Sequence, residues 1–341
     1  MSETVNIAFV ANKIANDIFS AFFWKVYPKR DSNFSCSNPE KHRTPTDKPK
    51  QLHPGDAVFH YIDPYLNKTI YLHTDLKSYG KSSLKISSIR TALNSLAMTV
   101  ECAETSPDWR KNFSDDNQEP NEVRGLLFVA NHDGKAPDDF DERLAKISRH
   151  SLAIAKDNIL HVLGPSAISS LYSVATDIKL SVANKQISSN YRFFYPDLTL
   201  WKRARAEDER NAATIETLLS PYFILKHGKV IGDDGIEIAQ KPGSIVYYSR
   251  KGETVDEFVY LLDSLSRYQL VNANEQIRIR VFNKDRSNQL KNNFDRAKRR
   301  YCDEWGFEEG RESEIMGITI DSINQISPNY SPDEIGWREE E

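Results

Sequence analysis

The sequence lacks any apolar run long enough to span a membrane. In 341 residues, no hydrophobic stretch approaches the roughly 20 residues that a transmembrane helix requires. The first residues, MSETVNIAFVANK, contain no basic segment followed by a long apolar core, so we expect no secretory signal. The sequence also contains no internal repeat and no low-complexity tract. We therefore predict a cytoplasmic protein that does not contact a membrane.

Cysteine is scarce. Cys36, Cys102 and Cys302 are scattered along the chain and odd in number, which argues against a disulfide framework and for free thiols in a reducing compartment. Cys36, His42 and His53 raise the question of a zinc site. The spacing contains no C-x₂-C pair and a fourth ligand cannot be counted, so we expect no zinc there. Cys102 ends an apolar helix and is expected in the core.

The composition is that of a globular protein with an uneven charge. The hydrophobic fraction is 39% and the charged fraction 28%, which permits a real core. The net charge is −4, but residues 303–341 contain twelve acids and two bases, which leaves +6 on the first 302 residues. A mildly basic body with an acidic tail is compatible with a polyanionic ligand. A charge of this size is also ordinary for a solvated surface.

Hydrophobic periodicity predicts an α/β protein of two domains, divided near residue 228. The first domain, residues 1–227, carries the longer series of alternating elements. We expect a helix at 5–24, a long loop at 28–55, strands at 56–62 and 69–77, a helix at 86–103, a buried strand at 124–132, a helix at 138–155, a short strand at 158–164, a helix opening at Pro165, a strand-like segment at 191–203 and a helical segment at 205–219.

The second domain, residues 228–341, is expected to be a small α/β domain with a basic helix and an acidic tail. Strands are predicted at 243–249, 276–283 and 315–323, and helices at 254–268 and 287–305. Thr254 and Glu257 form a capping box at the start of the first of these helices. This domain is a candidate interface for a partner or for oligomerisation.

Three charged residues lie at the ends of a predicted hairpin, in the stretch HPGDAVFHYIDPYLNKTIYLHTDLKSYG (53–80). If Ile62 pairs with Thr69, antiparallel register places Asp56 opposite Asp75. Alternation then places Lys77 on the same face. Two facing carboxylates repel each other unless a cation compensates them.

A divalent metal provides that compensation. Mg²⁺ prefers oxygen ligands, with Mn²⁺ as an alternative, and the carbonyl of Leu76 adds a third protein oxygen to Asp56 and Asp75. Lys77 would reach a metal-bound water or a scissile phosphate. The D-x-K tripeptide alone is a weak signal, since DGK (133–135) and DIK (177–179) also occur. Neither of these has an upstream aspartate on a neighbouring strand.

This stretch resembles the signature of the PD-(D/E)XK nuclease superfamily. PGDAVF is followed by IYLHTDLKSY at the spacing of that signature, and the flanking elements follow the α-β-β-β-α-β order of the family. The N-terminal half further resembles the nuclease-like subunit of a two-component bacterial anti-phage defence system. The resemblance implies a restriction-endonuclease-like core, a mixed sheet flanked by helices. It also implies metal ligands at Asp56 and Asp75, a catalytic Lys77 and a second protein subunit.

One departure from the family keeps two functions open. Many members carry an acid on the first helix, where this chain has Asn16 beside Asp17. We expect a Mg²⁺-dependent deoxyribonuclease of little sequence specificity, acting in a hetero-oligomer. The alternative is a non-catalytic nucleic-acid-binding or sensor subunit on a nuclease fold.

Candidate DNA contacts lie outside the hairpin. Arg90, early on the helix at 86–103, could contact a phosphate or could be an ordinary surface arginine. Residues 284–300 contain seven bases against two acids, and Lys291, Lys298 and Arg299 are expected on a basic face that neutralises phosphates. A solvated helix or a docking surface for the acidic tail would have the same composition.

Overall fold

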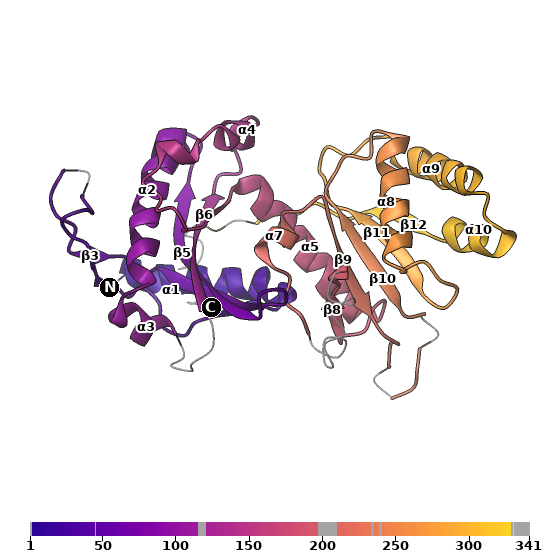
Figure 1. Ribbon diagram of the computed structural model, residues 1–341, viewed down its shortest axis with the longest axis horizontal. Coiled ribbons are helices and arrows are strands. Elements are labelled where there is room, and N and C mark those ends of the chain that lie inside the picture. The colour runs from indigo at the N-terminus through magenta and orange to yellow at the C-terminus, as the bar shows by residue number, and fades with distance from the viewer. Residues whose placement is uncertain are drawn as a thin grey trace. The chain divides into compact units, whose positions relative to one another are not determined.

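The computed structural model describes residues 2–44, 46–114, 121–196, 210–232, 235–238, 241–328 and 330 (Figure 1). It divides into two compact units, Met1–Ser169 with Ser327–Glu341 and Ser170–Ile326. Each unit is built on a five-stranded mixed sheet flanked by helices. The predicted α/β class is therefore confirmed. Among the described residues, no helix has the length and apolar character needed to cross a membrane.

The first sheet carries the predicted hairpin at its centre. Its order is β1-β4-β5-β6-β7, in which β1, β4 and β5 are antiparallel and β5, β6 and β7 are parallel. The continuous apolar run of β6 is buried along most of its length, as a central strand must be. The strands are β1 (Lys25–Val26), β4 (Ala57–Asp63), β5 (Lys68–Tyr79), β6 (Asn121–Asn131) and β7 (Leu160–Leu163).

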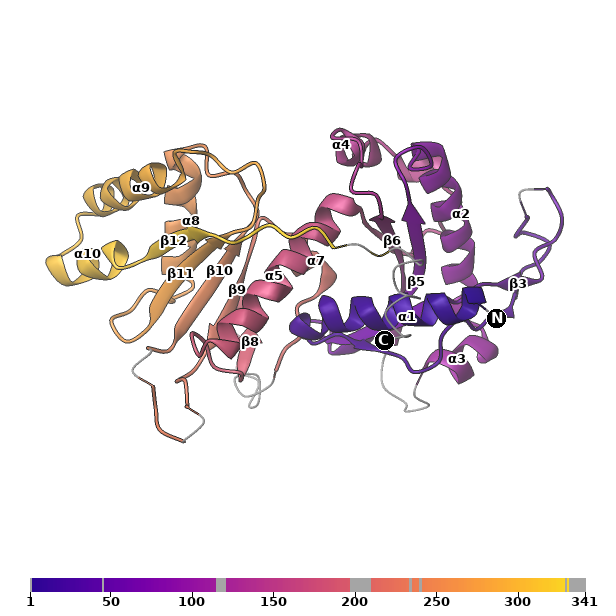
Figure 2. The same ribbon diagram turned by 180° about the vertical axis from the view of Figure 1, so that it is seen from behind.

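Helices cover both faces of this sheet (Figures 1 and 2). The turn η1 (Phe19–Phe22), which follows α1 (Ser2–Asp17), packs on one face, where the Phe19 ring lies 4.7 Å from Phe59 between centroids. The other face packs against α2 (Ile86–Ala103), which buries its apolar stripe against β6. Next to α2, the short helix α3 (Pro107–Phe113) adds Trp109 and Phe113 to the same core. Apolar side chains thus pack against both faces of the sheet.

The segment predicted as a long loop, residues 28–55, contains little regular structure. It forms a small antiparallel pair of β2 (Phe34–Ser35) and β3 (Leu52–His53), with Phe34 opposite His53. The backbone N–H of Asp31 donates a hydrogen bond to the carbonyl of Asp56, and that of Ser32 to the carbonyl of Gly55. The loop therefore runs beside the start of β4.

The second sheet has the order β12-β11-β10-β9-β8. Its strands are β8 (Tyr191–Phe193), β9 (Tyr222–His227), β10 (Gly243–Tyr248), β11 (Gln276–Val281) and β12 (Thr319–Ser322). The parallel run from β10 to β12, joined by helices, agrees with the predicted β-α-β-α-β pattern. The capping box of Thr254 and Glu257 is present at the start of α8.

Helices flank the second sheet as well. One face buries α8 (Val255–Arg267) and α9 (Leu290–Trp305) in a common core. On the other face, α5 (Pro165–Ala183) places Asp177, whose Oδ2 accepts a 2.8 Å hydrogen bond from the Tyr247 hydroxyl. Figures 1 and 2 show α5 and the α8–α9 pair on opposite sides of the strands.

Residue 228 lies inside this second unit. β9 and β10, on either side of it, pair antiparallel in one sheet from Gly243↔His227 to Tyr248↔Tyr222. The compact units instead divide within α5. The sequence could not indicate this, because β8 and β9 precede the parallel run and join its sheet only through long-range pairing.

Several predicted helices are shorter than expected. The helix at 5–24 ends at Asp17 and continues only as a 3₁₀ turn, after which Phe23 adopts a left-handed φ of 63°. The segment 138–155 contains α4 (Phe140–Ala145) and a 3₁₀ turn, separated because Ser148 is extended. The predicted segments 191–203 and 205–219 are described only as β8 and α7 (Ile215–Leu218), and residues 197–209 lie outside the described part.

Several elements were not predicted, among them α3, β9 and α10. α10 (Glu309–Met316) precedes β12, so the apolar residues Ile315 and Met316 end a helix rather than begin the last strand.

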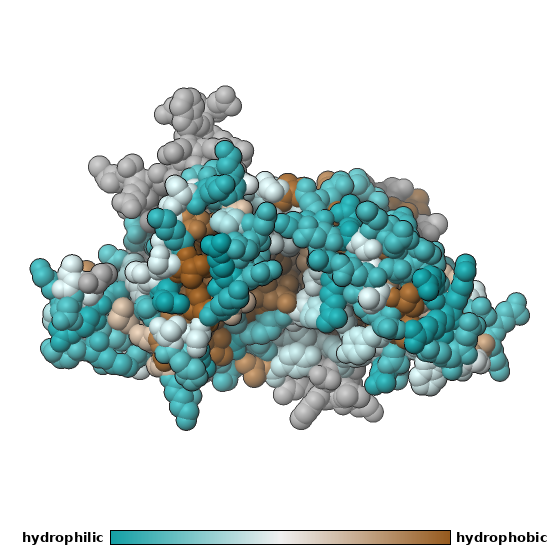
Figure 3. All heavy atoms as spheres, turned by 90° about the horizontal axis from the view of Figure 1, so that it is seen from above, coloured by the Kyte–Doolittle hydropathy of each residue, from teal (hydrophilic) through white to brown (hydrophobic). Residues whose placement is uncertain are grey.

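The exposed surface is mostly hydrophilic where Figure 3 shows it, with apolar residues in smaller patches. This agrees with the charged fraction of 28%.

Candidate active site

The hairpin has the register that the sequence predicted. Ile62 pairs with Thr69, and the ladder continues to the pair of Ala57 and Thr74. A tight turn sets this register, because Asp63 Oδ1 accepts hydrogen bonds from the two backbone N–H groups that follow it, at 2.8 and 2.9 Å. Asp56 therefore comes next in line opposite Asp75, just beyond the last paired residues.

Asp56 and Asp75 interact as a carboxylate pair. Burial raises the pKa of Asp56 to about 7, with the Asp75 charge as the next cause. The Leu76 N–H, which donates to Asp56 Oδ2 at 2.9 Å, and the Lys77 ammonium oppose this shift without cancelling it. Burial is thus the main cause of the raised pKa of Asp56, and the charge of Asp75 adds to it.

Lys77 completes the group from the same face of β5. Its Nζ lies 2.5 Å from Asp75 Oδ1, and its side chain is 37% exposed. Burial lowers the pKa of Lys77, but the charges of Asp75 and Asp56 outweigh it and raise the pKa above its ordinary value. Lys77 is therefore a cation at neutral pH, suited to donate to a phosphate oxygen rather than to accept a proton.

The main chain of β5 offers a further oxygen at this point. β4 ends its pairing at Thr74, while β5 continues alongside β6 to Tyr79. The N–H and C=O of one residue point to the same edge of a strand. Because the Leu76 N–H points to Asp56, the Leu76 carbonyl faces the same edge. Its role as a third metal ligand stays a prediction.

A small cavity of about 10 Å³ adjoins the carboxylates. Such a volume fits about one water or ion. Its lining combines the hairpin with α2: Pro54, Asp56, His73, Thr74, Asp75, Ser95, Leu96 and Thr99. The oxygen-rich donor set and the scale of the space both fit a hard divalent cation.

Lys50 is a cation near this site that the sequence analysis missed. Its Nζ donates to Ser95 Oγ at 3.1 Å, and Ser95 lines the cavity. Burial lowers the pKa of Lys50, and the nearby Cys36, then Asp75 and Cys102, act against this. No local motif marks Lys50, because it lies in the long loop and reaches the site only through the fold.

His73 has a structural role, because it fixes the backbone that leads into Asp56. Its Nε2–H donates to the Pro54 carbonyl at 3.0 Å, and its Nδ1 accepts from the Trp109 indole at 3.1 Å. Burial lowers the pKa of His73 to about 4, so the ring is neutral near pH 7. Both nitrogens are engaged, and the ring is 2% exposed.

The predicted DNA-binding residues differ in their exposure and contacts. Arg90 and Arg299 are exposed, as such contacts require, whereas Lys291 is exposed but pairs with Asp321 at 2.6 Å. The prediction that Lys298 lies on an exposed basic face must be corrected. Its side chain is 8% exposed, and its Nζ donates to the carbonyls of Met316 and Ile318. It joins α9 to the chain before β12 and is not part of an exposed basic face.

A mixed sheet with flanking helices, whose hairpin ends in the Asp56, Asp75 and Lys77 group, defines a PD-(D/E)XK nuclease-like domain. Comparison with family models identifies the particular family. Residues 1–167 match the GAPS4 protein PD-(D/E)XK nuclease domain, so this part of the chain belongs to that defence-associated nuclease family. No curated protein and no solved structure matches the chain.

A second cluster lies nearby on the loop and α2. The structure brings Cys36, His42, His53 and Cys102 together, with one ligand atom of each within 4.8 Å of the others. The sequence analysis could not count a fourth ligand here. The missing fourth ligand is Cys102, which lies 49 residues after His53 and was assigned only to the core.

Proposed function

We propose that the N-terminal unit is a metal-dependent DNA endonuclease. The facing carboxylates of Asp56 and Asp75 carry the proposal, because two neighbouring acids, of which Asp56 has a raised pKa, and the adjoining cavity suit a divalent cation. Mg²⁺ is the expected ion, with Mn²⁺ as an alternative. The family match supports nuclease chemistry in a defence system.

The proposed roles follow from the chemistry of each group. Asp56, Asp75 and the Leu76 carbonyl would hold the ion. When bound, the ion lowers the pKa of a coordinated water and offsets negative charge on the phosphate. Lys77, which remains protonated, would donate to a phosphate oxygen and stabilise the charge that develops there. Lys50 adds a second positive charge on the α2 side of the cavity.

DNA is the proposed substrate, and a second protein subunit is the proposed partner. An endonuclease acting in its own cytoplasm would damage the host genome, so its activity must be controlled. The resemblance to a two-component defence system supplies the kind of control, a hetero-oligomer that is active only after infection. The second unit, outside the matched residues 1–167, is the proposed place for partner contacts.

A plasmid-cleavage assay tests this function. The wild-type protein, alone or with the product of the neighbouring gene, should cleave plasmid with Mg²⁺ and not with EDTA. Asp75→Asn and Lys77→Ala should each lower the rate by roughly 10²–10³-fold. Asp157→Asn and Lys146→Ala, at exposed positions of the same unit, are matched controls that should retain the rate. Cleavage that survives both site substitutions would refute the assignment.

A non-catalytic DNA-binding subunit is the second candidate. Asn16 favours it, because it lies exposed on α1 where many family members carry an acid. Such a protein would bind DNA equally well with EDTA or Mg²⁺, and Asp75→Asn would leave the affinity unchanged. Under this alternative the wild type, with or without its partner, leaves the plasmid intact.

A further inference from the structure

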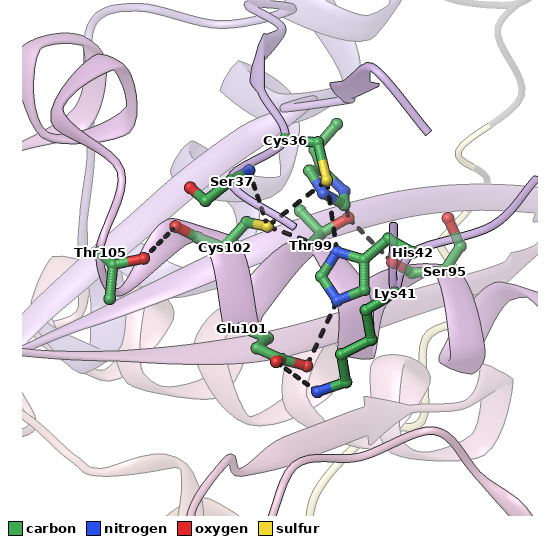
Figure 4. A network of polar contacts seen from close by, with 10 residues as sticks. Cys36, Ser37, Lys41, His42, Ser95, Thr99, Glu101, Cys102 and Thr105 are labelled. Atoms are coloured by element: carbon green, nitrogen blue, oxygen red, sulfur yellow. Dashed lines mark hydrogen bonds and ion pairs between the residues drawn. The ribbon is translucent and has the colours of Figure 1, made fainter. Parts of the chain in front are cut away.

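A buried cluster of thiols and imidazoles lies outside the proposed catalytic group. Cys36 follows β2, His42 lies in the long loop, His53 ends β3 and Cys102 is in the last turn of α2. Figure 4 shows Cys36, His42 and Cys102 directed toward one another. All four side chains are buried or partly buried. Two sulfurs and two imidazoles are the ligand set of a structural zinc site.

The distances agree with tetrahedral coordination. The two sulfurs lie 3.7 Å apart, and His42 Nδ1 lies 3.4 Å from each of them. A tetrahedral zinc with ordinary bond lengths places two sulfur ligands about 3.8 Å apart, and a sulfur and a nitrogen about 3.5 Å apart. A disulfide requires the sulfurs at about 2.05 Å. The cluster therefore has the spacing of a metal site rather than that of a covalent bond.

The hydrogen bonds of both histidines leave one ring nitrogen without a proton, as metal coordination requires. His42 Nε2 lies 3.3 Å from the Glu101 carboxylate, which can only accept, so Nε2 carries the proton and Nδ1 presents its lone pair to the sulfurs. Glu101 is fixed in turn by Lys41. A carboxylate behind a histidine is the usual outer partner of a zinc ligand.

His53 gives an independent indication. The Thr99 hydroxyl donates to the Ser95 carbonyl at 2.9 Å, so its oxygen accepts the proton of His53 Nδ1 at 3.1 Å. His53 Nε2 is then a buried lone pair, and no described residue donates to it. A metal ion would satisfy it.

We infer that Cys36, His42, His53 and Cys102 form a structural zinc site that fastens the 28–55 loop to the end of α2. The two thiols would lose their protons on binding, so that two thiolates balance the charge of the ion. The Ser37 N–H already points at Cys102 Sγ, at 3.3 Å, and would stabilise that thiolate. His53 is followed by Pro54 and Gly55, so the site also anchors the segment that leads into Asp56.

Elemental analysis of the full-length protein tests the inference. Protein purified without chelators should contain about one zinc per chain, and the double variant Cys36→Ser/Cys102→Ser should contain close to none. Cys302→Ser is the matched control, because Cys302 is a buried cysteine of the other unit. Asp75→Ala should also retain zinc, which separates this site from the proposed catalytic metal. Zinc that persists in the double variant would overturn the site.

A spectroscopic measurement on the wild type avoids reliance on variants that fail to fold. Protein loaded with Co²⁺ in place of zinc should show the ligand-field bands of a tetrahedral ion and a thiolate-to-cobalt charge-transfer band. The control Cys302→Ser should give the same spectrum. An octahedral cobalt spectrum, zinc-free wild-type protein, or a Cys36–Cys102 disulfide detected by mass spectrometry would each refute the proposal.

Discussion

At the scale of single residues, Asp56 is the point where function and stability oppose each other. Its carboxylate is partly buried beside another carboxylate, and its pKa of about 7 lies far above the ordinary value of 3.8. The folded state therefore favours protonated Asp56, and stability contributed by the proton is lost as the pH rises through 7. Above that pH, an ionised Asp56 without a cation destabilises the unit.

Asp56→Asn should stabilise the protein in EDTA at pH 8. In a separate assay with Mg²⁺, the same variant should no longer cleave plasmid. The amide removes the charge but keeps an oxygen that accepts from the Leu76 N–H. We expect a gain of roughly 1–3 kcal/mol, measured by urea unfolding. Asp157→Asn, an exposed control, should change neither property. A less stable Asp56→Asn protein would contradict the proposed repulsion.

Lys50→Ala should slow plasmid cleavage roughly 10-fold or more, because it removes a positive charge beside the cavity. Lys48→Ala provides the matched control, since Lys48 is exposed in the same loop. Comparing the two rates at saturating Mg²⁺ shows whether the loss of activity depends on the position of Lys50 or only on the total charge of the loop. Equal rates for the two variants would exclude Lys50 from the site.

At the scale of elements, the close packing of α2 on β6 depends on Gly125. A Cβ at this position would lie 2.4 Å from the Leu160 side chain and 3.0 Å from those of Leu96 and Val100. The contact matters for function because α2 supplies Ser95, Leu96 and Thr99 to the cavity, and Cys102 to the second cluster.

Gly125→Ala should therefore destabilise the protein by about 1–3 kcal/mol through overpacking. Chemical denaturation followed by circular dichroism measures the change. Gly228→Ala is the control, because an added Cβ there meets nothing within 4 Å. A Gly125→Ala protein as stable as the wild type would show that α2 can move away from the sheet without cost.

Local sequence patterns predicted the elements whose signals are local. The hairpin register followed from turn length and alternation, and the capping box of α8 from two side chains three residues apart. The patterns failed where distant residues decide. Lys298 read as part of a basic face, but its burial depends on carbonyls about 20 residues further along the chain. Cys102 is a core residue as predicted, but the local pattern did not indicate that it also lies beside Cys36 and His42.

At the scale of the whole molecule, two units with separate cores each contain a buried neutral histidine. In the first unit, His73 has a pKa lowered to about 4. In the second, burial and then the Arg278 charge lower the pKa of His227 below 6.5. Arg278 Nη2 donates to His227 Nε2 at 2.9 Å, and Nδ1 contacts the Gly228 carbonyl at 2.9 Å, so protonation would remove an acceptor.

The contribution of each buried histidine to stability should therefore be lost in acid. A group whose pKa is lowered by folding contributes full stability above its unfolded value, here 6.5, and loses it as the pH falls. His227→Gln should weaken this dependence below pH 6.5, as measured by urea unfolding at several pH values. His150→Gln, at an exposed position, should leave the dependence unchanged. An unaltered slope in His227→Gln would contradict the assignment.

The ending of the β4 ladder at Thr74 has a spectroscopic consequence. Beyond this point, the amide of Leu76 is held by a carboxylate side chain instead of a backbone carbonyl. Its proton resonance will therefore follow the charge on Asp56, since no intervening group separates the two. In a nitrogen-15 correlation spectrum, this peak should therefore shift when a cation binds at the hairpin. The place where the sheet stops pairing thus provides a built-in indicator of the state of the site.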